Sequence, residues 1–314
     1  MSSRFNRGTG LLIINVVNSN PNGDPDAESE PRTFEDGRGL ISPVSFKRKI
    51  RDLMFNPDDP VIEKKQSAPE EASEVRKAAL AAVGGNGTFD ILETRSRKRE
   101  LIDAMDAPAF QSKYWDARVF GNTFLESLKN KDDNQSKRDK GHFIATGVVQ
   151  FGPGTSLAPV DIQRLTLTNK SGVQEGKDRG MAPLAFRVVR HGLYIMPFFV
   201  NPSAAGKTGC DASDIDLLKF LIPHAYTHTA SGIRPQVEIV HAWYAEHKSP
   251  LGSCPDPLII AALTPHRKNK EETEKPSLSL SDYDVPGDLP EEIKSRLASF
   301  EDLCVKDWSV RRAA

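Results

Sequence analysis

Apolar side chains gather close to the N-terminus in a run that predicts a buried β-strand. The run covers residues 11–17, LLIINVV, and includes four β-branched residues. The segment that follows, NSNPNGDPD, contains Asn-Pro, Asn-Gly and Asp-Pro. These pairs mark turns because Asn tolerates a positive φ, Gly adopts one freely and Pro presets φ. We therefore expect a strand that ends in a turn over residues 18–26.

The apolar positions change to the period of a helix in GLISPVSFKRKIRDLM, residues 39–54. Ser42 suits the N-cap, and Pro43 suits the first helical position, where its missing N–H costs nothing. The apolar side chains of this stretch fall within one arc of about 100° on a helical projection. They are Phe46, Ile50, Leu53 and Met54. The pattern predicts an amphipathic helix that packs on the preceding strand.

Beyond residue 56 the pattern predicts an insertion and then a return to regular strands. Within the insertion we expect a polar helix over 69–83, a second helix that ends at Phe120 and a charged loop over 129–140. The later predicted elements are strands over 143–151, 160–168, 191–200 and 236–245, a hairpin turn over 169–172, and helices over 211–227 and 290–304.

This order reduces to β-α-β-β-α-β with two excursions, which is the ferredoxin-like topology of the RNA-recognition motif. We therefore predict an α+β fold whose main domain comprises residues 1–56 and 143–264. A hairpin over 159–190 belongs to that domain, residues 57–142 form the insertion, and residues 265–314 form a charged, partly helical tail.

Composition indicates a soluble globular protein. The chain has 314 residues, of which 38% are hydrophobic and 27% charged, enough for a sizeable core. No apolar run approaches the roughly 20 residues of a membrane span, and we expect no targeting peptide. Cys210, Cys254 and Cys304 are too widely spaced for a zinc motif or a disulfide framework. We therefore expect a reducing, cytoplasmic location.

Charge is distributed unevenly along the chain. The formal net charge of -1 excludes a uniformly basic nucleic-acid binder, yet six bases and only two acids lie between residues 32 and 51. Local basic patches on a neutral protein suit contact with a polyanion along one face. In the helix, Lys47, Arg48 and Arg51 follow the edge of the apolar arc, whereas Lys49 lies on the other side, where we expect a structural or solvated role. The basic cluster over 95–99 suits a nucleic-acid surface and a merely solubilising one equally.

The Asn- and Asp-rich turn approaches the pattern of a calcium loop but does not meet it. With Asn18 at position 1, Gly23 stands at position 6 and Ser29 at position 12, which requires a bidentate Glu. Asp24 and Asp26 could serve a two-metal nuclease, but no His or third acid stands near them in the sequence. We favour a structural turn and predict no metal or cofactor.

Four stretches closely resemble a known family: NSNPNGDPDAESEPRT, GRGLISPVSFKRKIRD, YWDARVFG and RHGLYIMPFF. The family is the Cas-seven group, the backbone subunits of CRISPR Cascade complexes, and the likeness is strongest to its type I-C members. The resemblance implies a right-hand shape, with a modified RNA-recognition-motif palm, a fingers insertion and a β-hairpin thumb. It also implies that copies stack head to tail along the spacer of a CRISPR RNA. Each thumb would displace one nucleotide from pairing with the target DNA.

The resemblance further implies that the helix matching Ser45, Phe46, Lys47, Arg48 and Arg51 contacts the RNA backbone. Our predicted RNA-binding residues are Arg32, Arg38, Ser45, Lys47, Arg48, Arg51, Arg164, Lys177, Arg179 and Met181. Basic side chains would hold phosphates without reading sequence, and base pairing would supply specificity. We expect no catalytic residue. The expected partners are CRISPR RNA, target DNA, further copies of this chain and other Cascade subunits, with no membrane.

Two other functions stay open from the sequence. One is a ribonuclease on the same fold, as in type III relatives of the family, with Asp161 or Asp178 as the acidic thumb residue. The other is a ferredoxin-like interaction domain that binds no nucleic acid. Cleavage of matched RNA would favour the first, and RNA that co-purifies with the protein would exclude the second.

Overall fold

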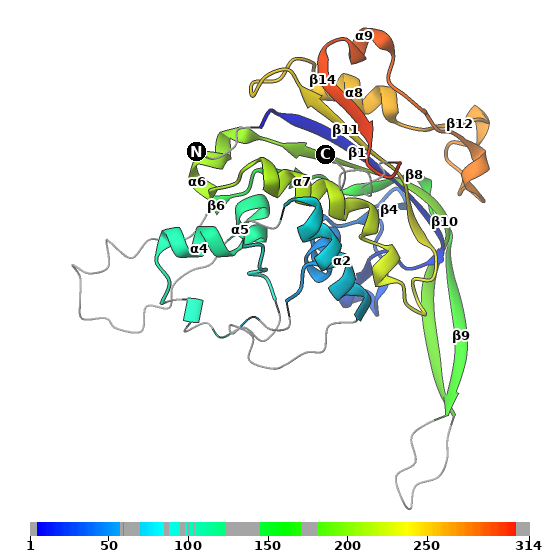
Figure 1. The fold of residues 1–314 in the computed structure, drawn as a ribbon. Coiled ribbons are helices and arrows are strands. Elements are labelled where there is room, and N and C mark those ends of the chain that lie inside the picture. Colours follow the sequence, from blue (N-terminus) through cyan, green and yellow to red (C-terminus); the bar gives the residue numbers. More distant parts are fainter. Residues whose placement is uncertain are drawn as a thin grey trace, which may run out of the picture.

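A large antiparallel sheet forms the centre of the molecule (Figure 1). The computed structural model describes residues 5–56, 59, 70–84, 88–94, 98, 101–102, 104–122, 145–170 and 181–305. The main path of the eight-stranded sheet runs β14-β11-β1-β10-β8-β4, and β7 and β9 also pair with β10. The strands are β1 (Gly8–Ser19), β4 (Arg38–Ile41), β7 (Val149–Phe151), β8 (Gly154–Pro159), β9 (Ile162–Lys170), β10 (Met181–Val200), β11 (Val237–His247) and β14 (Leu297–Asp302). The mixed helix and strand class predicted from the sequence is confirmed.

The length of β10 explains why three strands share one of its edges. This strand has 20 residues, and it pairs successively with β9, β8 and β7 as it runs through the sheet. On its other edge, β1 pairs from Ser19 opposite Val189 to Gly8 opposite Val200. The first part of β10, with β9, therefore leaves the body as a two-stranded ribbon, which Figure 1 shows below the sheet.

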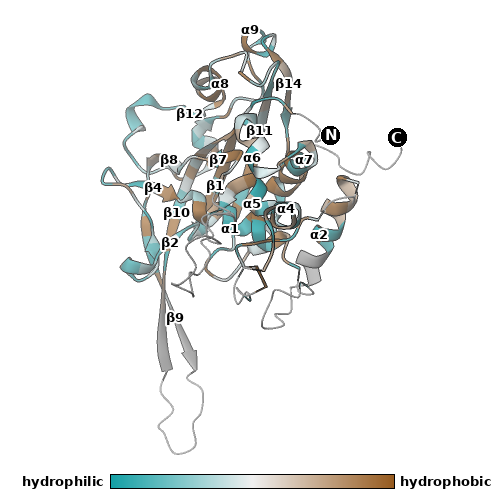
Figure 2. Ribbon diagram, turned by 90° about the vertical axis from the view of Figure 1, so that its left-hand side faces the viewer, coloured by the Kyte–Doolittle hydropathy of each residue, from teal (hydrophilic) through white to brown (hydrophobic). Residues whose placement is uncertain are grey.

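Helices cover one face of the sheet and bury the apolar arc predicted for the first helix. The helices on this face are α1 (Pro43–Leu53), α2 (Glu70–Ala82), α4 (Ala107–Lys113), α5 (Trp115–Phe120), α6 (Ala205–Thr208) and α7 (Ala212–Leu221). Two more, α8 (Asp256–Leu263) and α9 (Glu291–Lys294), belong to the other face. Phe46 and Ile50 of α1 join Leu218 of α7 and Leu12 of β1 in one buried cluster. In Figure 2, hydrophobic residues colour the strands around β1 and β10 and the neighbouring α7.

The other face of the sheet is covered by the C-terminal part of the chain. Alternate residues of β1, Leu11 and Ile13, pack there with Ile259 of α8 and with Tyr283 and Leu297. A strand buried on both faces has a continuous apolar sequence, which accounts for the run over residues 11–17. Because residues 283–297 supply part of this second core, the segment after residue 265 is structurally integrated with the sheet.

The helix predicted over 290–304 is wrong beyond its first turn. Only Glu291–Lys294 is helical, and Leu297–Asp302 forms β14, an edge strand paired with β11. The strand predicted over 236–245 is present as β11, but β14 follows it later in the chain. Leu297, Phe300 and Leu303 have a spacing that also suits a helix. The outcome is decided by pairing with β11 and by the Asp302 carboxylate, which accepts hydrogen bonds from His241 and from the Ala242 N–H of β11.

Turns were predicted with mixed success. The turn after β1 is present as a small hairpin of β2 (Gly23–Asp24) and β3 (Glu30–Pro31) around a 3-10 turn. Positive φ values occur at Asn18, Glu28 and Ser29 rather than at the central asparagines. The hairpin turn predicted over 169–172 begins too early, because β9 continues to Lys170, opposite Met181. Residues 171–180 and the loop predicted over 129–140 lie outside the described residues.

The remaining described elements are short. They are β5 (Gly121–Asn122), β6 (Ala145–Thr146), β12 (His266–Arg267), β13 (Tyr283–Asp284) and the 3-10 helices Pro25–Ala27, Pro202–Ala204, Ile222–His224, Thr227–Thr229, Lys270–Glu272 and Leu280–Asp282. The helix predicted over 211–227 gives way to 3-10 turns after Leu221, where Pro223 has no N–H to continue the α-helical hydrogen bonds. Within the described residues, every helix is too short or too polar to cross a bilayer.

Candidate nucleic-acid interface

The turn after β1 fixes the start of α1. Ser42 is the N-cap, as predicted, and its hydroxyl accepts a hydrogen bond from the Ser45 backbone N–H at 3.2 Å. The buried Asn22 side chain holds the cap in turn, because its Oδ1 accepts from both the N–H and the hydroxyl of Ser42 at 2.8 Å. Asn20 connects the same turn to the base of the hairpin by donating to the Arg187 carbonyl at 3.2 Å. The NSNPNG stretch therefore positions α1 and the hairpin.

Lys47 lies half-buried between α1 and α5. Its ammonium stands 5.3 Å from the centre of the Phe120 ring, a cation–π contact. Burial and, to a lesser extent, the nearby Arg51 guanidinium lower the pKa of Lys47. An anion at this position would favour the charged form of Lys47 and so oppose both causes of the lowered pKa. Lys47 is therefore suited to the phosphate contact predicted for it.

Arg51 is held more firmly than the sequence suggested. Its side chain is only 11% exposed, and its Nε lies 2.8 Å from Oδ2 of the buried Asp116. The same carboxylate accepts from the backbone N–H groups of Leu92 at 2.7 Å and Glu93 at 3.1 Å. Arg51 thus joins α1 to the insertion and has little freedom to bind a ligand. Two of the sequence stretches that carry the family resemblance meet at this ion pair.

Arg48 and Ser45 lie nearer to solvent. The Arg48 side chain is 41% exposed, and its Nε pairs with Asp52 at 2.7 Å, one helical turn away. Exposed pairs of this spacing contribute little free energy, so a phosphate can replace the carboxylate at small cost. Ser45 is half-buried, and its hydroxyl lies 3.4 Å from the Lys49 ammonium.

The other predicted residues lie away from α1. Arg32 pairs with Asp24 at 3.2 Å in the turn, and Arg38 pairs with Asp36 at 3.4 Å beside β4. Arg164 is exposed on the hairpin, opposite Arg187 in register. Met181 begins β10 opposite Lys170, whereas Lys177 and Arg179 lie outside the described residues. Of the 95–99 basic cluster, only Lys98 is described.

Sequence reasoning missed a pair of cations beneath α1, Lys49 and Arg234. Lys49 is 6% exposed, and its ammonium lies 5.4 Å from the centre of the Tyr226 ring. Burial, followed by the positive charge of Arg234, lowers the pKa of Lys49 to about 8. The helical projection places Lys49 away from the basic edge but cannot show that residues 226–234 cover it. No pattern in the sequence around Arg234 predicts that it lies near Lys49.

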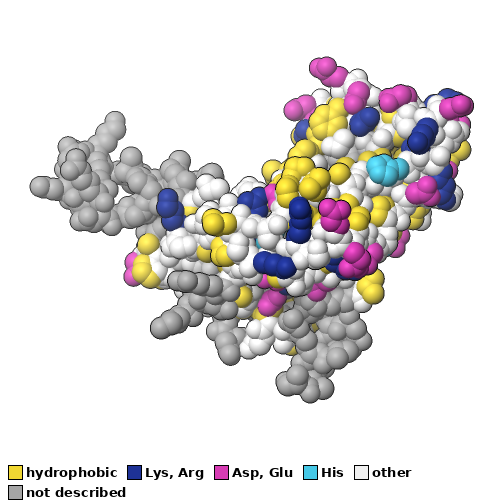
Figure 3. Space-filling view, turned by 90° about the horizontal axis from the view of Figure 1, so that it is seen from above, with side chains coloured by type: hydrophobic (Ala, Val, Ile, Leu, Met, Phe, Trp, Pro, Cys, Tyr) yellow, Lys and Arg dark blue, Asp and Glu magenta, His cyan; other side chains and the backbone are white. Residues whose placement is uncertain are grey.

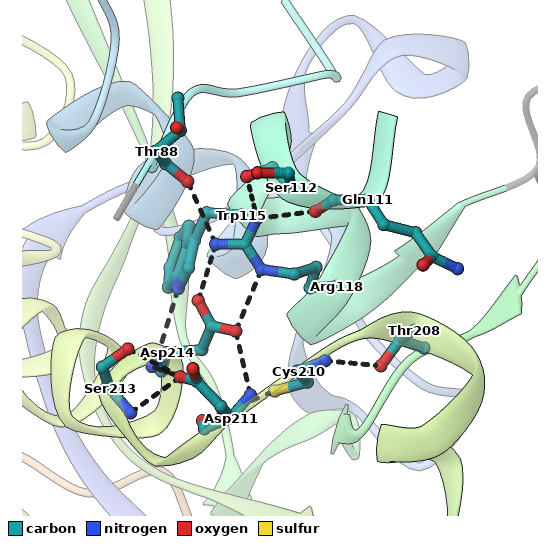
Figure 4. Close-up of polar contacts among 10 residues, drawn as sticks. All are labelled: Thr88, Gln111, Ser112, Trp115, Arg118, Thr208, Cys210, Asp211, Ser213 and Asp214. Carbon is teal, nitrogen blue, oxygen red and sulfur yellow. Dashed lines mark hydrogen bonds and ion pairs between the residues drawn. The ribbon is translucent and has the colours of Figure 1, made fainter. Parts of the chain in front are cut away.

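A second buried ion pair anchors the insertion to α7 (Figure 4). The Arg118 guanidinium contacts both carboxylate oxygens of Asp214, at 3.0 Å from Nε and 2.8 Å from Nη2. Its remaining N–H groups donate to the carbonyls of Gln111, Ser112 and Thr88 at 2.7, 2.7 and 3.1 Å. Every guanidinium nitrogen is used within the protein, so this arginine stabilises the fold and is not available to a ligand.

The acidic candidates are engaged in local contacts. Asp24 accepts from the Asp26 backbone N–H at 3.1 Å and pairs with Arg32, as a turn residue does. Asp161 lies 3.9 Å from Arg190 at the base of the hairpin, and Asp178 lies outside the described residues. Within the described part of the chain, no group of three His, Cys, Asp or Glu side chains is placed to hold a metal ion.

The opposite face of the molecule has a different character. Figure 3 shows Lys, Arg, Asp and Glu side chains interspersed there, with hydrophobic side chains among them. Leu251, 92% exposed, precedes α8, and Leu278 is also exposed. A face of mixed charge attracts a polyanion less than a face on which basic side chains are concentrated. The α1 side, with the hairpin base, is therefore the better candidate interface.

Comparison with known proteins places the chain in a family. A family model described as CRISPR-associated protein Cas7 matches residues 6–288. The CRISPR-associated protein Cas7 of Haloferax volcanii is 29% identical over 225 residues, which cover 69% of this chain and 63% of that relative. The match thus spans less than two thirds of the relative's length.

Two solved structures show a distant likeness. A chain of a structure titled "CRISPR RNA-guided surveillance complex, pre-nicking" has a TM-score of 0.42 and 13% identity, covering 76% of this chain and 78% of that one. A chain of a structure titled "CRISPR RNA-guided surveillance complex" has a TM-score of 0.35 and 15% identity, covering 83% and 78%. TM-scores this low carry no weight here, and the assignment rests on the family model. Because that model matches most of the chain, this protein belongs to the CRISPR-associated protein Cas7 family.

Proposed function

We propose that this protein is an RNA-binding backbone subunit of a Cascade-like CRISPR surveillance complex, of type I-C. The observation that carries the proposal is the family membership, which spans residues 6–288. The placement of Lys47 and Arg48 on one helix beside a projecting hairpin supports it.

The arrangement of the sheet supports a ferredoxin-like palm. Strands β11, β1, β10 and β7 are consecutive antiparallel neighbours, and α1 and α7 pack on one face of them. In chain order these elements run β1-α1-β7-β10-α7-β11, which is the β-α-β-β-α-β order of that topology. We assign the palm to residues 1–56 and 143–264, with the fingers at 57–142, the thumb at 159–190 and a C-terminal segment at 265–314.

The RNA backbone would lie along α1 and the base of the thumb. Lys47 and Arg48 would contact phosphates, Ser45 would contribute its hydroxyl, and Arg51 would support this surface through Asp116. Further contacts would come from Arg32 and Arg38 near β4 and from Arg164, Lys177, Arg179 and Met181 on the thumb. None of these contacts reads a base, so pairing with the guide would supply specificity for target DNA.

The protein would act as a scaffold in the cytoplasm, in contact with further copies of itself along the spacer and with other Cascade subunits. No described observation favours the ribonuclease alternative: Asp161 lies 3.9 Å from Arg190, and Asp178 lies outside the described residues. A cleavage assay with matched RNA addresses that alternative directly, and we expect intact RNA.

Purification from cells that carry a CRISPR array tests the proposal. We expect an absorbance ratio typical of bound nucleic acid, and sequencing should recover spacer-containing RNA. Lys47→Glu with Arg48→Glu should release the RNA because two phosphate contacts become repulsive. Lys268→Glu with Lys270→Glu makes the same charge change in an exposed segment elsewhere and should retain it. A protein free of RNA, or one bound to RNA without spacers, would contradict the proposal.

A further inference from the structure

Lys49 and Arg234 are two cations that lack a carboxylate partner among the described residues. The only hydrogen bond of the Lys49 ammonium there is the 3.4 Å contact with the Ser45 hydroxyl. Arg234 donates from Nε to the Asn20 carbonyl and from Nη1 to the Thr229 carbonyl, both at 3.2 Å. Both side chains therefore keep their positive charge uncompensated by an ion pair.

An unpaired cation at this depth is costly to the fold. Lys49 is 94% buried, since its exposed fraction is 6%, and buried ammonium groups are normally paired with an acid. The charged groups that act on it are Arg234, which opposes its charge, and Asp52, which favours it. Asp52, however, pairs with Arg48 at 2.7 Å. The Tyr226 hydroxyl stays neutral because burial raises its pKa.

The position of the two cations matches the path proposed for RNA. Lys49 lies one turn beyond Ser45, in a helix of 11 residues whose N-terminal dipole adds partial positive charge. Arg234 is held by the Asn20 carbonyl, and the Asn20 side chain is bonded to the Arg187 carbonyl at the hairpin base. The first turn of α1, the turn after β1 and the hairpin base thus converge on one positively charged site.

We propose that Lys49 and Arg234, with the first turn of α1, form a subsite for one phosphate group of the bound RNA backbone. The inference rests on the proposed function and adds a contact that neither the helical pattern nor the family resemblance assigned. The phosphate would supply the negative charge that no described carboxylate provides to these two cations. Filling the site would also favour the protonated form of Lys49, so RNA binding should take up a proton above neutral pH.

The test is the affinity of the purified full-length chain for a short labelled oligoadenylate, measured by fluorescence anisotropy in a salt series. Oligoadenylate carries no base that titrates in this range. For the wild type we expect about tenfold weaker binding at about pH 9 than at about pH 7. Lys49→Met should bind more weakly at neutral pH, lose most of the pH dependence and have a salt slope smaller by about 0.7.

Arg48→Met is the matched control. It removes an exposed cation of the same helix, so it should lower the salt slope by a similar amount but keep the pH dependence of the wild type. A second measurement separates binding from folding. Without RNA, Lys49→Met should melt at the same temperature as the wild type or higher, because it removes an uncompensated buried charge.

Each other result has a definite meaning. If Lys49→Met binds oligoadenylate with the affinity and salt slope of the wild type, the subsite is wrong and the proposed function stands. If it loses binding and also melts at a lower temperature, Lys49 is structural and the inference fails. Stabilisation of the wild type by millimolar inorganic phosphate, without any effect of Lys49→Met on RNA affinity, would indicate a free-anion site and overturn the RNA assignment. If the wild type itself binds no RNA, the proposed function fails first.

Discussion

Replacing Arg118 by alanine should destabilise the protein severely, although this residue lies far along the chain from any predicted ligand contact. The change removes both hydrogen bonds to Asp214 and leaves its carboxylate, 2% exposed, without a counter-charge. It also leaves the Gln111, Ser112 and Thr88 carbonyls without their donor. Breaking one side of a buried ion pair costs about 3–5 kcal/mol, and we expect a loss of unfolding free energy in that range.

The same geometry predicts that losing both partners is milder than losing one. Burial raises the pKa of Asp214 even though Arg118 opposes that shift, so desolvation is the larger influence on this carboxyl group. Arg118→Met combined with Asp214→Asn removes both charges and retains the volume of each side chain. We expect the double variant to be more stable than Arg118→Ala by at least about 1 kcal/mol.

Urea denaturation followed by tryptophan fluorescence is a suitable assay, because the Trp115 indole donates to the Asp214 carbonyl at 3.2 Å and reports on this region. Arg48→Ala is the control, since it also removes an arginine paired with an aspartate, but in an exposed pair worth about 0.5 kcal/mol or less. If Arg118→Ala and Arg48→Ala differ by less than about 1 kcal/mol, the idea that the buried pair anchors the insertion is wrong.

Three further predictions concern the turn, the buried lysine and the hairpin. Asn22→Ala should lower the unfolding free energy by about 1–3 kcal/mol, because it removes the acceptor for the Ser42 cap, whereas Asn18→Ala at an exposed position should cost less than about 1 kcal/mol; thermal melts of both variants check this. The pKa of Lys49, about 8 in the folded state, lies below its ordinary 10.5, so the unfolded chain binds the extra proton between these values. Relative to Lys49→Met, the wild type should therefore gain about 1 kcal/mol of stability from pH 7 to 9, measured by urea titration, and a loss over that range would contradict the assignment. If the hairpin over 159–190 displaces one nucleotide per copy, binding of targets with single mismatches walked along the spacer should show a regularly repeating tolerated position, and a uniform penalty would rule this out.

Local signals in the sequence were sufficient for the elements that depend on neighbouring residues alone. The N-cap at Ser42, the proline at position 43 and the apolar period predicted α1 correctly, because these effects act within one or two helical turns. The double-sided burial of β1 was likewise visible as a continuous apolar run. The family resemblance was confirmed by the family model.

Features that depend on distant partners were not predictable in the same way. β14 forms because β11 offers it an edge, and Leu297, Phe300 and Leu303 alone suit a helix equally well. The same limitation applies to the candidate site. Arg51 and Arg48 carry the same charge. In the structure, however, Arg51 is buried and paired with Asp116, 65 residues later, whereas Arg48 remains exposed. Whether a basic residue is available to a ligand is therefore set by tertiary contacts.

The continuity of β10 has a mechanical consequence. The strand belongs to the hairpin up to Val189, where Ile162 is its partner on one edge and Ser19 on the other, and it then crosses the core without a break. Along β10 no loop or glycine separates the projecting ribbon from the sheet at that point, since residues 187–190 are all in regular strand. On the other side of the ribbon, residues 160–161 interrupt the strand between β8 and β9. A sideways force on the outer end of the ribbon is therefore resisted at its base, where β10 is held by pairing with β1. The angle of the ribbon is set by the twist of the central sheet, and shortening β9 or β10 should change its reach while leaving its direction unchanged.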